Sequence, residues 1–411
     1  MPRLAELLSQ VRVVAFPLAS RVHGEGYYRP VLERFRRVFR GLGVECGGLM
    51  ITGLEDVEKV RVEDIDVAVL LFLTGGTSAA ARRLVERLAG KPVILIGHLY
   101  HNSIASAVSA ASKLRARGFR PVLLPYRGGE SIIELARVLK VARLVSALSK
   151  MKVVHIGGDG GWERFLEVTG ARVVTVKPGD VELPEAGVDE QLAARIDLGG
   201  VEPGLVAKPY ALYRALKKLI EEFDAHGLAI DCFSFLEEKG FTPCLALSLL
   251  LDDGYPAACE ADYRSLLLLA LAQGLTGRPG WIGNIVDTGR GRLMLAHCTV
   301  ATSLTSYATL LPHFETGKPY AVAGTMKQGE YTIAAIDPEY RVLKAAKAKL
   351  KYSGTLTGGR CRTQSVFEAD IDFDELVSNH HVAMQGDVRR ELRIAAYLLG
   401  MRYEEYGAGR G

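Results

Sequence analysis

The sequence predicts an α/β protein in which two doubly wound domains precede a mostly antiparallel, β-barrel-like C-terminal domain. In residues 1–128 short aliphatic runs alternate with amphipathic helical segments, and residues 129–276 repeat that rhythm. From about residue 277 the pattern changes, because short strand-like runs then follow one another without helices between them. A chain of 411 residues also exceeds the length that one hydrophobic core usually serves. We therefore expect three domains, at residues 1–128, 129–276 and 277–411.

The first domain is predicted from four runs rich in β-branched and aliphatic residues, which are typical of buried parallel strands. A helical segment at residues 29–42 has its apolar side chains at a helical period and predicts a covering helix. Parallel strands with helices between them predict a Rossmann-like sheet. The four runs cover residues 11–16, 67–73, 92–96 and 121–124.

The second domain begins with a helical segment at residues 131–149 and is again expected to be Rossmann-like. Its predicted strands cover residues 153–156, 172–176 and 228–230. Residues 177–203 are rich in proline and glycine and predict a long connection, with a short helix near residues 190–195. The glycine-rich residues 157–161 follow a strand but lack the GxGxxG spacing, so we do not predict a nucleotide cofactor.

The third domain is predicted from five short strand-like runs, which indicate a mostly antiparallel barrel. A final helix is expected at residues 388–399, where apolar side chains recur at a helical period. The five runs cover residues 293–297, 320–323, 331–335, 350–353 and 363–367.

Composition excludes several classes of partner. The net charge is only +4, from 51 basic and 47 acidic residues, and the basic residues are scattered, so neither a nucleic-acid nor a membrane surface is predicted. The apolar run at residues 266–271 is too short to span a bilayer. Six cysteines without CxxC spacing and no secretion signal favour the cytoplasm, with reduced thiols. Asparagine occurs only three times, which indicates a thermophilic source.

Two carboxylates, Glu260 and Asp262, end a run of small residues just before a helical segment at residues 266–272. Active sites of α/β proteins lie at such carboxyl ends of strands. A structural alternative is equally compatible with this local pattern: Asp262 caps the helix, and Glu260 pairs with an arginine.

Further polar groups lie on the predicted strands of the third domain or at their ends. Asn284, Asp287 and His297 interrupt apolar runs, and polar groups in such places need a partner or a function. His380 and His381 are adjacent in an extended segment, so their side chains point to opposite faces and at most one is a direct metal ligand. A lone histidine pair is more often structural than metal-binding.

Four motifs together resemble the L-fucose isomerase and L-arabinose isomerase family over about residues 240–400. The resemblance implies one divalent ion, usually manganese, with magnesium or cobalt as alternatives. The ion is held by a glutamate, an aspartate and a histidine, and the first and last correspond to Glu260 and His380. The aspartate falls on Asn284, whose carbonyl can coordinate a cation but brings no charge and cannot act as a base. The motifs are Cys259-Glu260-Ala261-Asp262, Thr276-Gly277-Arg278-Pro279, Ala296-His297-Cys298 and Asn379-His380-His381.

The resemblance also suggests roles for surrounding residues. His297 is expected as an additional ligand, with His381 behind His380 near the substrate. Arg362 is expected to hold a substrate hydroxyl or carboxylate, although pairing with a surface acid is the alternative. The family forms trimers or hexamers, so we expect a homo-oligomer in which His101 or Asn102 of one subunit lies near a neighbour's sugar.

The function predicted from these residues is metal-dependent isomerisation of a free pentose or 6-deoxyhexose between aldose and ketose through an ene-diol. Glu260 would move protons, with Asp287 or a metal-bound water as the opposing acid or base, and a divalent ion would polarise the oxygens. Two alternatives remain open. One is a non-isomerising sugar-binding or regulatory protein on the same scaffold, and the other is an epimerase or a glycosidase that uses Glu260 and Asp287 as a carboxylate pair.

Overall fold

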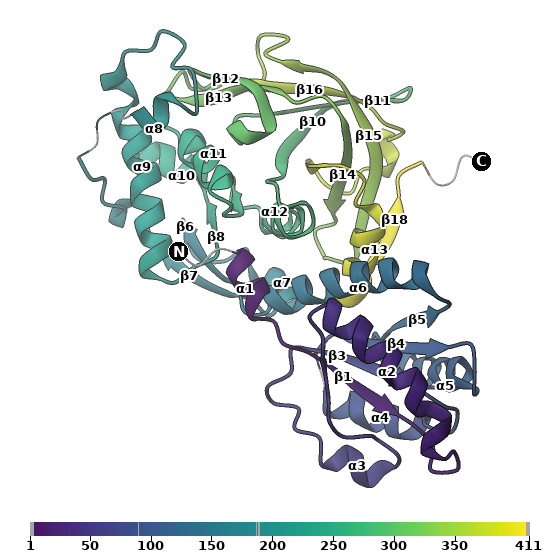
Figure 1. The fold of residues 1–411 in the computed structure, drawn as a ribbon. Coiled ribbons are helices and arrows are strands. Elements are labelled where there is room, and N and C mark those ends of the chain that lie inside the picture. The colour runs from purple at the N-terminus through teal and green to yellow at the C-terminus, as the bar shows by residue number, and fades with distance from the viewer. Residues whose placement is uncertain (1–3, 89, 186, 188–189, 408–411) are drawn as a thin grey trace. The chain divides into compact units, whose positions relative to one another are not determined.

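A computed structural model describes residues 4–88, 90–185, 187 and 190–407, and the chain divides into two compact units. One unit comprises residues 8–147 and 397–400, and the other comprises residues 1–7, 148–396 and 401–411. Three helices contain residues of both units: α1 (Leu4–Gln10), α6 (Gly129–Leu148) and α13 (Arg389–Leu399). Figure 1 labels the elements along the chain.

The smaller unit is built on a five-stranded parallel sheet with the strand order β2-β1-β3-β4-β5. Strands β1, β3 and β4 are buried along their whole length, because helices cover the sheet, and this explains their unbroken aliphatic sequences. The strands are β1 (Val13–Leu18), β2 (Glu45–Cys46), β3 (Val67–Phe72), β4 (Val93–His98) and β5 (Val122–Tyr126). The remaining helices are α2 (Glu25–Gly41), α3 (Leu54–Glu58), α4 (Ser78–Arg87) and α5 (Ser103–Arg115).

The larger unit begins with a four-stranded parallel sheet of order β7-β6-β8-β9. Its strands are β6 (Lys152–Ile156), β7 (Arg172–Val176), β8 (Gly227–Ile230) and β9 (Ala257–Ala258). The accompanying helices are α7 (Glu163–Thr169), η1 (Pro178–Asp180), α8 (Glu190–Ala193), α9 (Pro203–Glu222), α10 (Cys232–Lys239), α11 (Cys244–Asp252) and α12 (Tyr263–Thr276). The strands that the sequence predicted for this segment are therefore confirmed.

A closed antiparallel barrel of six strands follows in the same unit. Its order is β14-β17-β10-β11-β16-β15, and the pairing of β14 with β15 closes the ring. The strands are β10 (Trp281–Gly289), β11 (Arg292–His297), β14 (Glu330–Ile336), β15 (Val342–Gly354), β16 (Thr363–Glu368) and β17 (His380–Gln385). The predicted α/β class, with parallel sheets and an antiparallel barrel, is thus confirmed.

Smaller elements complete the larger unit. A separate two-stranded sheet consists of β12 (Thr305–Leu311) and β13 (Ala321–Met326), and β18 (Arg402–Glu405) adds to β15 in parallel. The 3₁₀ helices η2 (Thr302–Leu304) and η3 (Phe373–Glu375) lie in the connections. In the part of the chain that the structure describes, no helix combines the length and apolar character needed to cross a bilayer.

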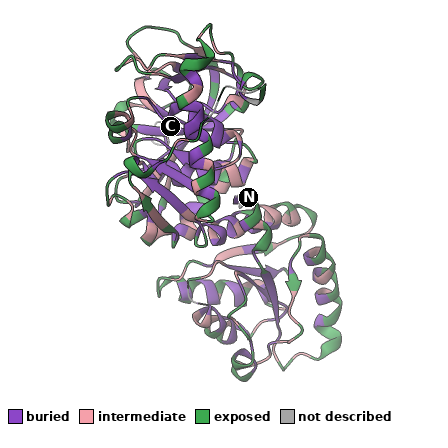
Figure 2. Ribbon diagram, turned by 90° about the vertical axis from the view of Figure 1, so that its left-hand side faces the viewer, coloured by how far each residue is buried: buried purple, intermediate pink, exposed green. Residues whose placement is uncertain are grey.

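Helix α12 packs against both the parallel sheet and the barrel of the larger unit. It packs against β8 and β9 of the parallel sheet and against β10, β14 and β17 of the barrel. The helix is buried almost all round, as its run of leucines and alanines requires, and Figure 2 shows the buried strands and helices of this unit. The turn between β9 and α12 is therefore held close to the ends of barrel strands.

Candidate active site

Glu260 lies in the turn between β9 and α12, and its backbone has an uncommon conformation. Glu260 and Ala261 have φ angles of 55° and 48°, in the left-handed region that side chains with a Cβ disfavour. The turn is fixed by the N–H of Ala261, which donates to the carbonyl oxygen of Ile230 at 2.8 Å. Strained residues of this kind cluster at functional sites, where surrounding contacts hold them.

Asp262 is the N-cap of α12 and also contacts a histidine. Its Oδ1 accepts hydrogen bonds from the backbone N–H groups of Arg264 and Ser265. Its Oδ2 lies 2.8 Å from Nδ1 of His380. The structural alternative considered for Asp262 is therefore confirmed, whereas Glu260 faces histidines instead of an arginine.

The barrel register brings the remaining polar groups together. His380 is the first residue of β17, and His297 is the last residue of β11. Between these strands runs β10, in which Asn284 pairs with His380 on one side and with Ala296 on the other. Residues that are almost a hundred positions apart in the sequence thus become neighbours.

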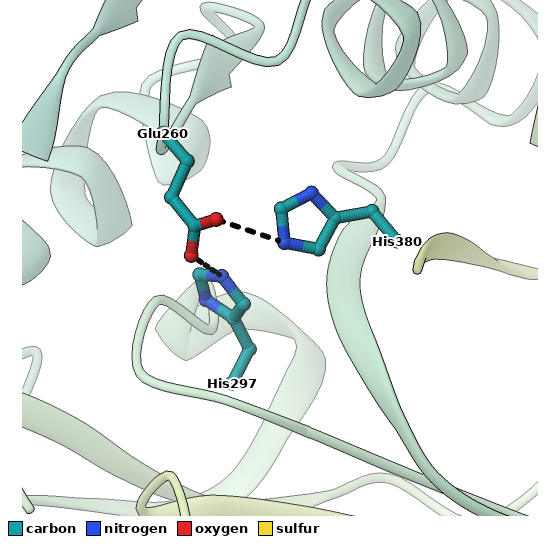
Figure 3. Close-up of side chains that lie close together, drawn as sticks. All are labelled: Glu260, His297 and His380. Carbon is teal, nitrogen blue, oxygen red and sulfur yellow. Dashed lines mark ion pairs between the residues drawn. The ribbon is translucent and has the colours of Figure 1, made fainter. Parts of the chain in front are cut away.

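The carboxylate of Glu260 lies between the two imidazole rings (Figure 3). Its Oε2 is 3.6 Å from Nε2 of His380, and its Oε1 is 3.9 Å from Nε2 of His297. One donor atom from each of the three residues lies within 4.8 Å of the others. Nδ1 of each ring contacts a separate partner, Asp262 for His380 and the Thr299 hydroxyl at 2.9 Å for His297.

Burial and the two carboxylates set the charges of these groups. Burial opposes protonation of His380, but its hydrogen bond to Asp262 and the nearby Glu260 carboxylate outweigh this effect and raise its pKa to about 9. Burial lowers the pKa of His297 to about 4, with a further contribution from His380. The neighbouring His380 ring lowers the pKa of Glu260, so this carboxylate is ionised at neutral pH. The site therefore favours positive charge beside Glu260.

A cavity of about 380 Å³ opens beside Glu260, which is large enough for a small organic ligand. Glu260, Asn284 and His297 line it together with several thiols, aromatic residues and charged groups. The cavity is also lined by Cys232, Cys244, Cys259, Cys298, Cys361, His313 and Arg360.

Three predicted residues of the same unit lie away from the cluster. Asn284 and Val286 line the cavity, whereas Asp287 follows a bulge in β10, does not line the cavity and pairs with Arg292. Arg362 donates through Nε to the carbonyl oxygen of Pro312 at 2.7 Å. His381 is buried on the opposite face of β17, as predicted, with Nε2 2.8 Å from the Tyr406 hydroxyl.

His101 and Asn102 belong to the smaller unit, and both have left-handed backbone angles, with φ of 57° and 56°. The His101 ring packs against Tyr27, with ring centroids 4.0 Å apart. The cluster around Glu260 contains neither residue, so their expected place beside a neighbouring subunit's sugar stays a prediction.

Sequence reasoning missed two features of the site. Asp262 was noted beside Glu260 and as a possible helix cap, but its contact with His380 was not predicted. The cysteines were dismissed because they lack a metal-binding spacing, but Cys232, Cys259 and Cys298 meet at the cavity through the fold. Only the proximity of Cys259 to Glu260 and of Cys298 to His297 signalled this in the sequence.

The residues present fit a divalent cation. Nε2 of His380 is buried and has no hydrogen-bond partner among the described residues, while Nδ1 lies 2.8 Å from Asp262. Metal-binding histidines typically have this arrangement, in which a carboxylate or hydroxyl fixes one ring nitrogen and the other binds the ion. His297, Glu260 and His380 would hold the ion, with the Asn284 side chain in the same cavity wall.

Comparison with known proteins gives two relatives of the same description. The chain is 24% identical over 353 residues to a sulfoquinovose isomerase from Alkalicoccus urumqiensis, covering 76% of this chain and 78% of the relative. It is 25% identical over 353 residues to a sulfoquinovose isomerase from Clostridium sp. (strain MSTE9), covering 77% and 79%. On this similarity, the protein is an isomerase. No protein-family model matches the isomerase chain.

One solved structure aligns with part of this isomerase, but only weakly. It is described as a two-component system response regulator/GGDEF domain protein and covers 65% of this chain and 98% of its own. Its TM-score is 0.28 at 11% identity, which is too low to bear on fold or function.

Proposed function

We propose that this isomerase interconverts an aldose and a ketose with the help of a divalent ion held by Glu260, His297 and His380. The observation that supports the proposal most directly is the ionised Glu260 carboxylate between two imidazole Nε2 atoms. The two relatives act on a sugar according to their names, which agrees with the resemblance found in the sequence.

The donor set bears on the identity of the ion. Two imidazole nitrogens and one carboxylate suit Mn²⁺ or Co²⁺ better than Mg²⁺, because Mg²⁺ prefers oxygen ligands in strict octahedral geometry. Asn284 stands where the related family has an aspartate, so the site has one negative charge less. We therefore expect the ion to be held more weakly than in a site with an aspartate at this position.

Isomerisation moves one proton from C2 of the aldose to C1 and a second proton from the C2 hydroxyl to the C1 oxygen, so that the carbonyl shifts from C1 to C2. When bound, a divalent ion supplies positive charge beside the two sugar oxygens and stabilises the negative charge that develops there. Glu260 is the chain's own proton carrier: an Oε atom takes the C2 proton and returns it to C1. Its lowered pKa keeps it ready to accept that proton at neutral pH.

The cavity wall favours a second substrate class beside a free pentose or 6-deoxyhexose. Arg360 lines the cavity, and Nη1 of its guanidinium lies 3.2 Å from the Met294 sulfur. Within the described part of the chain, Arg360 has no ion pair with a carboxylate. A guanidinium that is not paired with a carboxylate can bind an anionic group of a ligand with two parallel hydrogen bonds. A hexose with a terminal sulfonate, as in the relatives' name, is therefore the second candidate substrate.

A glycosidase is less well supported. It would need Glu260 and a second carboxylate across one substrate, and Asp287 was the expected partner. Asp287 instead pairs with Arg292 and does not line the cavity. A protein that binds a sugar without converting it does not need a second carboxylate in the cavity. Measuring ketose formation distinguishes such a protein from an isomerase.

The test is ketose formation by metal-stripped protein, with and without added Mn²⁺. The sugars are L-fucose, D-arabinose, L-arabinose and sulfoquinovose, and Glu260→Gln is the control. We expect Mn²⁺-dependent ketose from at least one sugar and none from the variant. Sugar binding by calorimetry without any product would contradict the proposal and indicate a binding protein. Turnover of sulfoquinovose that Arg360→Met abolishes would assign the second substrate class.

A further inference from the structure

The cavity beside Glu260 is unusually rich in thiols. Five of the six cysteines of the chain line it, and only Cys46 lies elsewhere, in the smaller unit. All six are free thiols in the structure. The proposed isomerisation uses none of them, so their gathering beside the proton carrier calls for an explanation. The five residues are Cys232, Cys244, Cys259, Cys298 and Cys361.

Two of these thiols are in direct contact. The sulfur atoms of Cys232 and Cys259 lie 2.9 Å apart, although the residues are 27 positions apart in the sequence. Cys232 is half-buried and faces the cavity, whereas Cys259 is buried. A reagent that enters the cavity therefore reaches Cys232 first and leaves Cys259 as the second thiol.

This thiol pair is joined to Glu260 by both covalent and hydrogen bonds. Cys259 precedes Glu260 in the chain, and the backbone N–H of Glu260 donates to the Cys232 sulfur at 3.2 Å. A disulfide bond is about 2.05 Å long, so closing this pair shortens the distance between the sulfur atoms by about 0.9 Å. Cys232 is the first residue of helix α10, whereas Cys259 lies in an irregular turn. The turn, and Glu260 with it, must take up most of the movement.

We propose that Cys232 and Cys259 form a reversible dithiol–disulfide pair through which peroxides switch off the site around Glu260. Hydrogen peroxide oxidises the Cys232 thiol to a sulfenic acid and releases one water molecule. The Cys259 sulfur then attacks the Cys232 sulfur, an S–S bond forms, and a second water molecule leaves. A dithiol reductant reverses the reaction by thiol–disulfide exchange and becomes oxidised itself.

The effect on turnover rests on the proposed isomerase function, whereas the formation of the disulfide does not. Displacing the Glu260 carboxylate from its place between His297 and His380 separates it from the groups that orient it. A misplacement of about 1 Å in a catalytic group can lower the rate by about 100-fold. We therefore expect at least a tenfold loss of activity in the oxidised protein.

The experiment treats full-length wild-type protein with hydrogen peroxide, blocks the remaining thiols with iodoacetamide, and maps the peptides by mass spectrometry. We expect one disulfide, between Cys232 and Cys259, that dithiothreitol removes, together with the fall and recovery of ketose formation. Alkylation of both cysteines after peroxide would overturn the proposal. So would a disulfide between Cys298 and Cys361 in place of the expected one.

Variants separate the two parts of the claim. In Cys232→Ser and Cys259→Ser, the ratio of activity after peroxide to activity before it should approach one, because no disulfide can form. Cys46→Ser is the matched control and should respond to peroxide like wild type. If the protein isomerises no sugar in either state, the proposed function fails, but the peptide map still decides whether the thiol pair closes. An unchanged peroxide response in Cys232→Ser would contradict the switch.

Discussion

At the scale of single residues, two adjacent histidines differ completely in their surroundings. His380 contacts Asp262 and Glu260, which raise its pKa to about 9 against the effect of burial. His381 lies on the other face of the strand, where burial lowers its pKa to about 3 and Tyr406 is its partner. Of these two histidines, only His380 has a buried Nε2 directed toward Glu260. The alternation of strand side chains therefore places His380 beside Glu260, where we propose that it binds the ion, and leaves His381 to packing.

This difference predicts opposite effects of two equivalent substitutions. His380→Gln should weaken Mn²⁺ binding at least 100-fold, because it removes a ligand. His381→Gln should leave Mn²⁺ affinity within about threefold of wild type, although the loss of a buried contact lowers the melting temperature. Titration calorimetry with Mn²⁺ measures the first effect and thermal unfolding the second. Equal losses of affinity in both variants would contradict the assignment.

Asp262 provides a second residue-scale prediction. Asp262→Asn keeps a good N-cap for α12 but removes the negative charge that holds Nδ1 of His380. Partners of this kind typically contribute 10-fold to 100-fold to metal affinity. Mn²⁺ affinity should fall by that factor while the melting temperature changes little. Asp231→Asn is the matched control, since Asp231 caps α10 in the same way without contacting His380. A fall in Mn²⁺ affinity in both variants would show that replacing any helix-capping aspartate weakens Mn²⁺ binding, and would contradict a specific role of Asp262.

At the scale of elements, the site depends on the register of three barrel strands. Strand β10 lies between β11 and β17, and its residue Asn284 pairs with His380 and with Ala296, which precedes His297. Gly283 lies one position earlier in β10, and a Cβ there would approach the Cβ of Leu295 in β11 to 2.8 Å. A side chain at this position therefore forces β10 and β11 apart beside the site.

Gly283→Ala should consequently destabilise the protein by about 1–3 kcal/mol, as overpacked substitutions do, and weaken Mn²⁺ binding. Gly204→Ala is the matched control, because Gly204 lies in helix α9 with no atom within 4 Å of the added Cβ. Alanine there should stabilise the helix by up to about 1 kcal/mol. Denaturant unfolding of both variants provides the measurement, and equal stability of Gly283→Ala and wild type would refute the packing argument.

At the scale of the whole molecule, local sequence patterns predicted the helices and strands better than the contacts between residues that lie far apart in the chain. The aliphatic runs at β1, β3, β4 and β6 identified buried parallel strands because burial on both faces leaves a continuous apolar sequence. The contact of Asp262 with His380 spans 118 positions, and that of Cys232 with Cys259 spans 27. No local period encodes such contacts. Glu260, His297 and His380 could be named as a group only through the resemblance.

The stability of the larger unit depends in part on a buried charged network outside the site. Asp253 accepts hydrogen bonds from Tyr213, Lys217 and Arg195 at 2.6–2.9 Å. Burial alone would raise the pKa of Asp253, but these hydrogen bonds outweigh it and lower the pKa. A carboxyl with a lowered pKa stabilises the fold fully above its unfolded pKa of about 3.9, and this contribution is lost as pH falls through the lower folded value.

Asp253→Asn should therefore lower the free energy of unfolding by roughly 3 kcal/mol at pH 7, since it leaves Lys217 and Arg195 without their acidic partner. The difference from wild type should shrink as pH falls below about 3.9. Asp287→Asn serves as the control, because the Asp287–Arg292 pair is exposed and should contribute less than about 1 kcal/mol. Urea unfolding between pH 2 and pH 7 measures the free energy of unfolding of both variants. A difference between Asp253→Asn and wild type that stays constant across this range would contradict the predicted dependence on the protonation of Asp253.

We propose that Glu260, His297 and His380 bind the ion on which isomerisation depends. The most direct test of this proposal is the initial rate of ketose formation as a function of Mn²⁺ concentration, measured on wild type and on Glu260→Gln after removal of all metal. We expect no rate without Mn²⁺, a saturable rise in wild type with one ion bound per chain, and no rise in the variant. An undiminished rate in metal-free wild-type protein, or full activity of Glu260→Gln, would contradict it.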